Sequence, residues 1–187
     1  MGIVYGNLWL FFEKKNKKKI YRKGNLPTGR ILNNLLKDYV IGSPTYVIRK
    51  KSLESLTHYF NDNFHIIGDF DINMRLAAKW KAKCVQSALA FARIHGKNLS
   101  LLHREKEINE LKTWFNLMKN DQLISSQKNF NNVMLTASYL EAMQFIMKNG
   151  FIKNFIMVTK YPFCFNKIKL ILALLIPKYL LKKLKNY

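Results

Sequence analysis

Two carboxylates lie one residue apart in the stretch "HIIGDFDINMRLAAKW", which runs from His65 to Trp80. Acids are scarce in this chain, with 11 Asp and Glu residues against 32 Lys and Arg, so the pair could mark a working site. Asp69 follows Gly68 at the predicted start of a helix, where a carboxylate caps free N–H groups and meets the positive end of the helix dipole. A partly exposed carboxylate held ionised there can also act as a general base. Spacing and composition alone favour the capping role.

Asp71, the second carboxylate of the pair, has a simpler interpretation. Arg75 follows it by four residues, so both side chains lie on one face of the predicted helix. That arrangement is typical of an ion pair, which contributes a few tenths of a kcal/mol when it is exposed. We therefore interpret Asp71 as a structural residue and keep Asp69 as the candidate for chemistry.

Residue periodicity predicts the elements that position these acids. Ile72, Leu76 and Trp80 recur at i, i+4 and i+8, which predicts a helix from Phe70 to Trp80. The other elements predicted before residue 100 are a strand at Ile3–Phe12, a basic turn at Lys14–Lys19 with a return strand in "KIYRKG", a helix in "LPTGRILNNLLKDY" capped by Thr28 or Gly29, a strand at Thr45–Arg49, a short helix in "KSLESLTHYF" and a strand at Ala88–Ile94. After residue 100, the residue pattern predicts helices at Leu101–Met118 and Val133–Met147. The predicted fold is α/β, a mixed sheet with flanking helices, followed by a mostly helical carboxy-terminal region.

Composition limits the class of protein and its partners. The chain has 187 residues, of which 49% are hydrophobic, so it can form a core and is not globally disordered. Its formal net charge of +21 attracts anions such as nucleic acid, anionic lipid or phosphorylated small molecules. Cys84 and Cys164 match no metal-ligand spacing, and two isolated thiols are typical of a reducing cytoplasm.

Four stretches taken in order resemble a known family. They are "VYGNLWLFF", "LPTGRILNNLLKDYVIGSPTYVIRK", "FHIIGDFDINMRLAAKW" and "ALAFARIHGKNLS". The series is similar to the acceptor-side half of family-2 glycosyltransferases, which are inverting enzymes with a GT-A fold. In that family a motif of the form E/G-D-[FY]-D-L-x-x-R-L-A precedes R-x-H-x-x-N-x-S, and the matches here are "GDFDINMRLA" and "RIHGKNLS". The resemblance covers residues 3 to 118, and we expect a GT-A-like region with those bounds.

The resemblance implies roles for four residues. Asp69 matches the catalytic base, which takes the proton of the acceptor hydroxyl as its oxygen attacks the anomeric carbon of the sugar. His95 matches a histidine that approaches the donor diphosphate or a divalent metal, Mn or Mg, and Arg93 would serve the same anionic group. The alternatives are an ordinary loop histidine and a surface arginine. Thr45 lies near where the family binds acceptors, although strand packing is the favoured interpretation. The implied substrates are a nucleotide-sugar donor and a saccharide or lipid-linked acceptor in surface polysaccharide, lipopolysaccharide or capsule biosynthesis.

The donor-binding half of the family has no counterpart in this sequence. That half carries the first βα units and a D-x-D motif for the metal, whereas the first acid here is Glu13. "DFD" at Asp69–Asp71 matches the D-x-D pattern, but it lies too late in the order of the family's motifs and at a helix start. We therefore do not interpret it as the metal motif. We expect negligible transferase activity from this chain alone. The two alternatives are a truncated gene product and one piece of a split enzyme, whose other half a partner chain would supply.

The carboxy-terminal tail predicts a membrane contact. After a helical extension at residues 119–165, residues 166–187 combine an apolar run, Leu170–Pro177, with flanking lysines. The run is shorter than the about 20 residues that a spanning helix needs, and Pro177 would kink it. A basic amphipathic helix on an anionic leaflet fits this pattern, and a core helix is the alternative. We expect a cytoplasmic protein, peripheral on the inner face of the cell membrane.

Two other function classes remain open at this point. A basic nucleic-acid-binding protein would account for the charge and for aromatic residues near basic runs, such as Tyr5, Trp9 and Tyr21. No nucleic-acid-binding motif appears, however, and the lysines are scattered, so no specific nucleic acid is expected. A small membrane-surface adaptor built around the tail helix is the other alternative.

Overall fold

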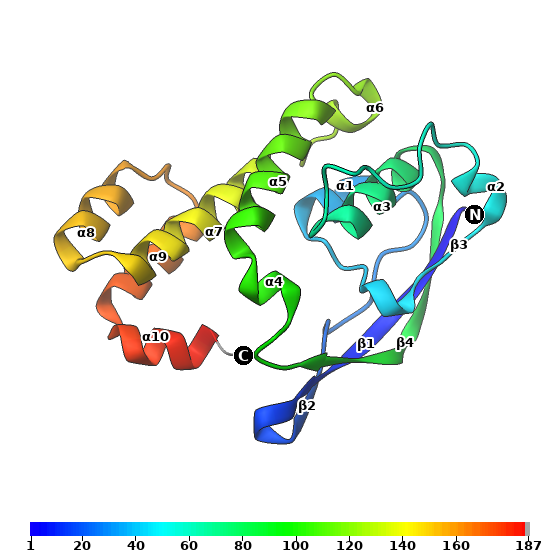
Figure 1. The fold of residues 1–187 in the computed structure, drawn as a ribbon. Coiled ribbons are helices and arrows are strands. Elements are labelled where there is room, and N and C mark those ends of the chain that lie inside the picture. Colours follow the sequence, from blue (N-terminus) through cyan, green and yellow to red (C-terminus); the bar gives the residue numbers. More distant parts are fainter. Residues whose placement is uncertain (186–187) are drawn as a thin grey trace. The chain divides into compact units, whose positions relative to one another are not determined.

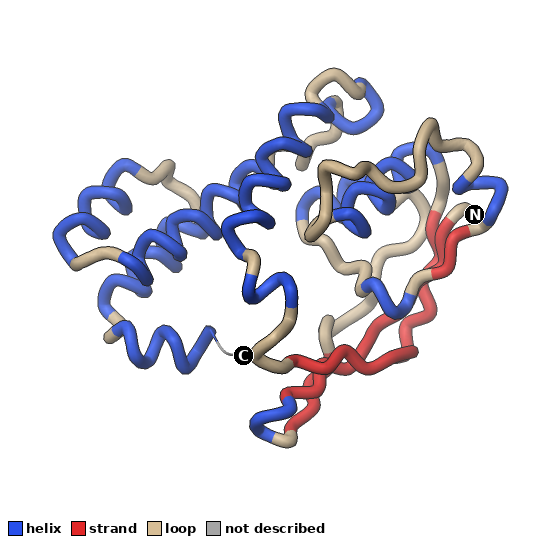
Figure 2. The backbone as a smooth tube through the Cα atoms, viewed as in Figure 1, coloured by secondary structure: helices blue, strands red, loops and turns tan. Residues whose placement is uncertain are grey.

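The computed structural model describes the backbone of residues 1–185, and the side chains of this range except at positions 100, 101 and 182–185. The chain divides into two units, Met1–Met134 and Leu135–Tyr187. All four strands lie in the first unit, and the described part of the second is helical (Figure 2). The predicted α/β region followed by a mostly helical region is therefore confirmed. The finer division at residues 118 and 165 stays a prediction.

The sheet of the first unit is built around β1 (Ile3–Phe12). β2 (Lys17–Ile20) pairs antiparallel with the second half of β1, and β3 (Val47–Ile48) pairs antiparallel with Ile3 and Val4. β4 (Ala82–Ile94) pairs parallel with β1 along its whole length, with irregular register around Asn7 (Figure 1). The sheet is thus mixed, with β4 at one edge and β2 and β3 sharing the other.

Six α-helices and two short 3-10 helices lie between and after the strands of this unit. They are η1 (Glu13–Lys15), α1 (Leu32–Lys37), η2 (Ser43–Thr45), α2 (Lys50–Leu53), α3 (Gly68–Lys79), α4 (Leu99–Leu102), α5 (Arg104–Met118) and α6 (Gln122–Ser125). α1 and α3 pack side by side next to β1 and β4 (Figure 1). Fully buried apolar side chains from these elements form the core, among them Ile3, Tyr5, Leu35, Ile72, Leu76 and Trp114.

The second unit is a set of four helices. α7 (Asn132–Lys148) begins just before the unit boundary and is followed by α8 (Phe151–Lys160), α9 (Phe165–Leu175) and α10 (Lys178–Lys185). Their core contains Ala142, Ile146, Val158, Tyr161, Leu170, Ala173 and Leu181. The tail predicted as one helix is two, because α9 ends at Leu175 and Pro177, which donates no backbone hydrogen bond, precedes α10. None of the described helices is long and apolar enough to cross a membrane.

Two local predictions were wrong for physical reasons. Thr28 and Gly29 do not cap α1, whose N-cap is Ile31 without a side-chain hydrogen bond. Instead, the Gly29 backbone forms a two-way bridge with Ala82, and the Thr28 hydroxyl donates to the Ala82 carbonyl at 3.1 Å. β4 begins six residues before the predicted strand, because exposed polar residues in its first half hide the strand pattern.

Candidate functional site

Asp69 lies in the first turn of α3, as the sequence predicted, and its carboxylate has two hydrogen-bond partners. One oxygen, Oδ1, accepts the Phe70 backbone N–H at 2.8 Å. The other, Oδ2, accepts a short hydrogen bond from the Ser43 hydroxyl. The residue is half-buried, so one side of the carboxylate remains open to solvent. A carboxylate in this position is oriented by the protein and still accessible to a substrate hydroxyl.

The loop that carries Ser43 is pressed tightly against β1. A Cβ added at Gly42 would lie 2.2 Å from Cδ2 of Leu8, whose side chain is buried, so only glycine allows this approach. Thr45 is buried, and its Oγ1 lies 2.9 Å from the Gly6 carbonyl oxygen and 2.8 Å from that of Gly42. Thr45 therefore belongs to η2 rather than to the predicted strand. It holds the loop in place, which is a positioning role for Ser43.

Two tyrosines complete the surroundings of Asp69. The Tyr39 hydroxyl donates to the Asp69 backbone carbonyl at 3.3 Å and accepts from the Asn73 side-chain amide at 3.0 Å. Burial raises the pKa of Tyr39 far above its ordinary value, and the negative charge of Asp69 raises it further. The pKa of Tyr46 is raised by the same two causes in the same order. Both phenols therefore keep their protons to a higher pH than an exposed tyrosine, and the Tyr39 hydroxyl supports the Asp69 backbone.

Asp71 and Arg75 form the predicted i, i+4 ion pair, but the pair is buried rather than exposed. The guanidinium Nη2 lies 2.7 Å from Asp71 Oδ2, and the side chains are 10% and 2% exposed. Trp114 Nε1 donates to Asp71 Oδ1 at 3.0 Å, and Arg75 also donates to the carbonyls of His58 and Tyr59. The carboxylate is satisfied on both oxygens, so Asp71 holds α3, α5 and the preceding loop together.

Asp69 accepts one free N–H of the first turn of α3, that of Phe70, as expected of a capping residue, and Glu110 of α5 holds the three residues before the helix. The buried carboxylate of Glu110 accepts the backbone N–H groups of His65, Ile66 and Ile67 at 2.8–3.1 Å. These groups lead into α3, whose N-cap Ile67 has no side-chain hydrogen bond of its own. Glu110 fixes the segment that enters α3, while the Asp69 carboxylate bonds both Phe70 and Ser43. Sequence reasoning missed Glu110, Ser43 and Tyr39, because each is distant in sequence from Asp69.

His95 and Arg93 lie at the far end of β4. His95 follows the last strand residue; its backbone N–H donates to the Asn98 side chain at 2.7 Å, and its Nδ1 accepts the Lys97 backbone N–H at 3.1 Å. The Arg93 guanidinium lies 3.8 Å from the Glu13 carboxylate. Both residues hold the turn after β4, and the exposed Arg93 side chain remains partly available.

This turn does not fit a divalent metal. Because Nδ1 of His95 accepts a hydrogen bond, the neutral ring carries its proton on Nε2, which then donates rather than ligates. A Cβ at Gly96 would lie 4.0 Å from the Lys14 ammonium, so a cation from the segment after β1 lies next to this turn. Among the described residues there is no group of three or more His, Cys, Asp or Glu that could hold a metal ion. The chemistry of this turn instead suits an anionic oxygen.

The two parts of the predicted site are separated along the sheet. Gly42, next to Ser43, approaches Leu8, which pairs with Ala90 of β4. His95 lies five residues further along, and at the rise of an extended strand this is roughly 17 Å. The fold therefore does not bring His95 and Arg93 into contact with Asp69, and their shared role in donor binding stays a prediction.

Comparisons with protein-family models, with curated proteins and with solved structures each find no match to this chain.

Proposed function

We propose that this chain is the acceptor-side part of an inverting glycosyltransferase and that Asp69 is its catalytic base. The observation that carries the proposal is the placement of the Asp69 carboxylate: half-buried at the start of α3, oriented by Ser43 and by the Phe70 N–H, and open on its remaining side. The Tyr39 hydroxyl donates to the Asp69 backbone carbonyl at 3.3 Å, and Tyr46 directly follows η2, which carries Ser43. The resemblance of "GDFDINMRLA" and "RIHGKNLS" to the family adds the reaction class.

In the proposed reaction the Asp69 carboxylate accepts the proton of an acceptor hydroxyl. The hydroxyl oxygen forms a bond to the anomeric carbon of the donor sugar, and the bond from that carbon to the diphosphate oxygen breaks on the opposite face. The configuration therefore inverts, and one base suffices because the diphosphate leaves as an anion. The saccharide or lipid-linked acceptor would lie over Ser43, Tyr46 and the open side of Asp69.

The donor is proposed to bind with help from a second polypeptide. From Val85 onward, no strand in the described part of the chain pairs with the edge of β4 opposite β1. A long free edge offers N–H and C=O groups to strands of another chain. A donor-binding chain added at this edge would extend the sheet.

The proposed location is the cytoplasmic face of the cell membrane. A transferase that acts on lipid-linked acceptors must reach them at the leaflet surface. The second unit supports this location, because its helices combine exposed apolar residues with lysines.

The proposal is tested by acceptor binding and by transfer. NMR titration of the chain with a panel of saccharides should perturb the amide signals of Ser43, Tyr46 and Phe70. Transfer from a panel of nucleotide sugars should be negligible with the chain alone. It should become measurable when the chain is co-expressed with an adjacent gene product that carries a D-x-D motif.

The matched variants are Asp69→Asn and Asp62→Asn, since Asp62 is an exposed loop carboxylate seven positions earlier. Asp69→Asn should abolish transfer and leave saccharide binding within a few fold, whereas Asp62→Asn should change neither. Saccharide binding elsewhere, or transfer that survives Asp69→Asn, contradicts the assignment of the base. Asp69-dependent transfer by the chain alone would contradict only the need for a second polypeptide.

A further inference from the structure

Helix α8 has apolar side chains on two faces, and only one face is packed. Asn154 and Val158 point into the core of the second unit. Phe151, Ile152, Phe155 and Ile156 are spaced i, i+1, i+4 and i+5, so they share a face adjacent to the buried one, and their exposed fractions are 62%, 74%, 53% and 49%. Four large apolar residues exposed together on a ten-residue helix form a patch that monomeric soluble proteins rarely leave open.

Helix α9, which packs against α8, repeats this arrangement. Leu170 and Ala173 are buried, whereas five large apolar residues are exposed: Phe165, Ile168, Ile171, Leu172 and Leu175. Phe163, in the turn between the two helices, is 90% exposed. Lys167 of α9 ties the end of α8 in place by donating to the carbonyls of Thr159 at 2.9 Å and Tyr161 at 2.7 Å. The two helices thus form one packed element with exposed apolar residues on both.

The charged residues of this unit are almost all positive. Residues 135–187 contain nine lysines, at positions 148, 153, 160, 167, 169, 178, 182, 183 and 185, and one acid, Glu141. Lys153 and Lys160 are exposed and lie beside the apolar face of α8. The side chains at 182, 183 and 185 lie outside the described residues. A second copy of this unit would be repelled by like charge, whereas an anionic surface would be attracted.

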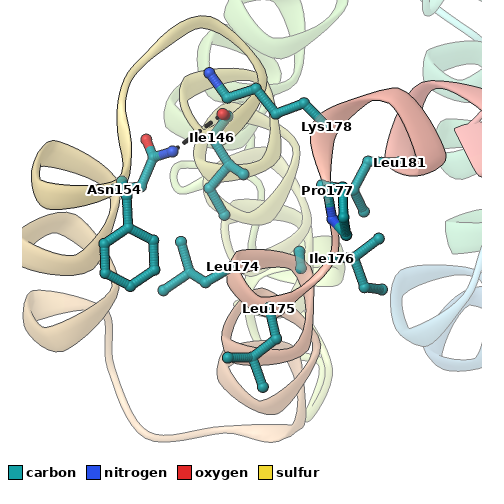
Figure 3. Close-up of a pocket in the computed structure, with 10 residues that line it drawn as sticks. Ile146, Asn154, Leu174, Leu175, Ile176, Pro177, Lys178 and Leu181 are labelled. Carbon is teal, nitrogen blue, oxygen red and sulfur yellow. Dashed lines mark hydrogen bonds between the residues drawn. The ribbon is translucent and has the colours of Figure 1, made fainter.

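A cavity of about 280 Å³ lies beside the apolar face (Figure 3). It opens between α7, α8 and the junction of α9 with α10, and Phe151 and Leu175 belong both to its lining and to the exposed faces. At its rim the Lys178 ammonium donates to the Asn149 carbonyl at 2.5 Å. An apolar space next to an ammonium suits an amphipathic molecule with an anionic head.

We propose that the exposed apolar faces of α8 and α9 insert into the headgroup and acyl boundary of an anionic phospholipid leaflet, with the flanking lysines contacting lipid phosphates. The inference rests on the proposed location at a membrane, not on transferase chemistry. It places the main insertion on α8, which precedes the basic tail of residues 166–187 from which the sequence predicted membrane contact. Apolar burial combined with lysine attraction is the mode of interfacial helices.

Vesicle binding by the full chain tests this proposal. Co-sedimentation with vesicles of phosphatidylglycerol and phosphatidylcholine should show binding that rises with the anionic fraction and falls with salt. The double variant Ile152→Ser/Phe155→Ser should bind about tenfold more weakly or worse. Phe91→Ser is the matched control, because Phe91 is 63% exposed but lies in the first unit, and it should leave binding unchanged. Lys153→Gln/Lys160→Gln should reduce the preference for phosphatidylglycerol.

A tryptophan at position 152 reports insertion directly. Ile152→Trp should show a blue-shifted emission with vesicles, relative to the parent protein, and quenching by lipids brominated near the headgroup. Circular dichroism of the serine variants should match the parent, which keeps a folding defect distinct from a binding defect.

The outcomes separate the claims. Suppose that Ile152→Ser/Phe155→Ser leaves vesicle binding unchanged, whereas replacing the lysines of the tail at residues 166–187 abolishes it. This result would overturn insertion through α8 and leave the membrane location intact. No binding to any vesicle would overturn both the insertion and the location, while Asp69-dependent transfer would still stand. Binding to an acidic protein without vesicle binding would identify a protein as the occupant and overturn the proposal.

Discussion

The Ser43 hydroxyl donates a hydrogen bond to the Asp69 carboxylate, although the two residues are 26 positions apart. This contact joins η2 to the first turn of α3. Because the Phe70 N–H holds the other carboxylate oxygen, Asp69 has one orientation rather than several. A general base gains from such a fixed orientation, since proton transfer requires hydrogen-bond distance and alignment.

Removing the Ser43 hydroxyl should weaken catalysis more than folding. Ser43→Ala leaves the Asp69 carboxylate with one orienting partner, so we expect transfer by the complemented enzyme to fall by about ten- to a hundredfold. The exposed site should lose only about 1 kcal/mol of unfolding free energy. Initial rates and denaturant unfolding measure the two effects. The control is Ser55→Ala. It removes a hydroxyl that accepts a hydrogen bond from Trp80 Nε1 at 2.9 Å and does not contact Asp69, so it should leave the rate unchanged. Equal rates for both variants would show that Ser43 does not orient the base.

Alkaline pH should destabilise the fold through the buried phenols. The pKa of Tyr39 is raised above its ordinary value near 10 by burial and by the charge of Asp69, so the folded state keeps a proton that the unfolded chain releases. The stabilisation is complete below about pH 10 and is lost as the pH rises toward the folded-state value. Urea unfolding at a series of pH values should show this loss, and Tyr39→Phe should flatten it.

Asp69→Asn offers a second check on the same tyrosines. It removes the negative charge that raises the pKa of Tyr46, so tyrosinate absorbance in the folded protein should appear at lower pH than in the parent. A titration curve identical to that of the parent would show that the charge of the Asp69 carboxylate does not affect the pKa of these phenols.

Local pattern was enough to locate the elements that hold the site. The β-forming run Ile3–Phe12 is a strand with those bounds, and the Ile72–Leu76 spacing predicted α3 to within two residues of its observed start. The pairing of Asp71 with Arg75 also followed from spacing. These features depend on residues within one or two helical turns of one another, and such signals can be recognised in a single sequence.

The contacts that shape the site could not be predicted, because they join distant segments. Asp71 is buried by Trp114, 43 residues further along the chain. The i, i+4 spacing of Asp71 and Arg75 therefore predicted the ion pair but could not predict that the pair is buried. Glu110 holds the segment that enters α3 from a similar distance in sequence, and no local pattern marks it. The tail lysines and apolar residues predicted one amphipathic helix at residues 166–187. The exposed apolar face of α8 depends on how the four helices pack, so no local pattern marked it.

The burial of the Asp71–Arg75 pair predicts a large stability effect. Asp71→Ala would leave the Arg75 guanidinium buried without its counter-charge, which we expect to cost about 3–5 kcal/mol of unfolding free energy. Lys50 and Glu54 provide a matched i, i+4 pair on the surface, 3.8 Å apart, so Glu54→Ala should cost at most about 0.5 kcal/mol. Denaturant unfolding of both variants measures the contrast. Similar losses for the two would mean that Asp71 is solvated in solution.

The turn after β4 should bind an anion and not a divalent metal. The Nδ1 atom of His95 accepts the Lys97 N–H, which leaves a donor at Nε2, and Lys14 and Arg93 add positive charge. Inorganic pyrophosphate should therefore shift the His95 ring signals in NMR spectra, with an affinity that falls as salt rises. Mn²⁺ at the same concentration should not broaden these signals selectively. His95→Phe removes the donor and should weaken pyrophosphate binding several-fold, whereas His103→Phe, on an exposed histidine between α4 and α5, should not. Selective broadening by Mn²⁺ would show that Nε2 ligates a metal and that the Lys97 hydrogen bond does not set the tautomer.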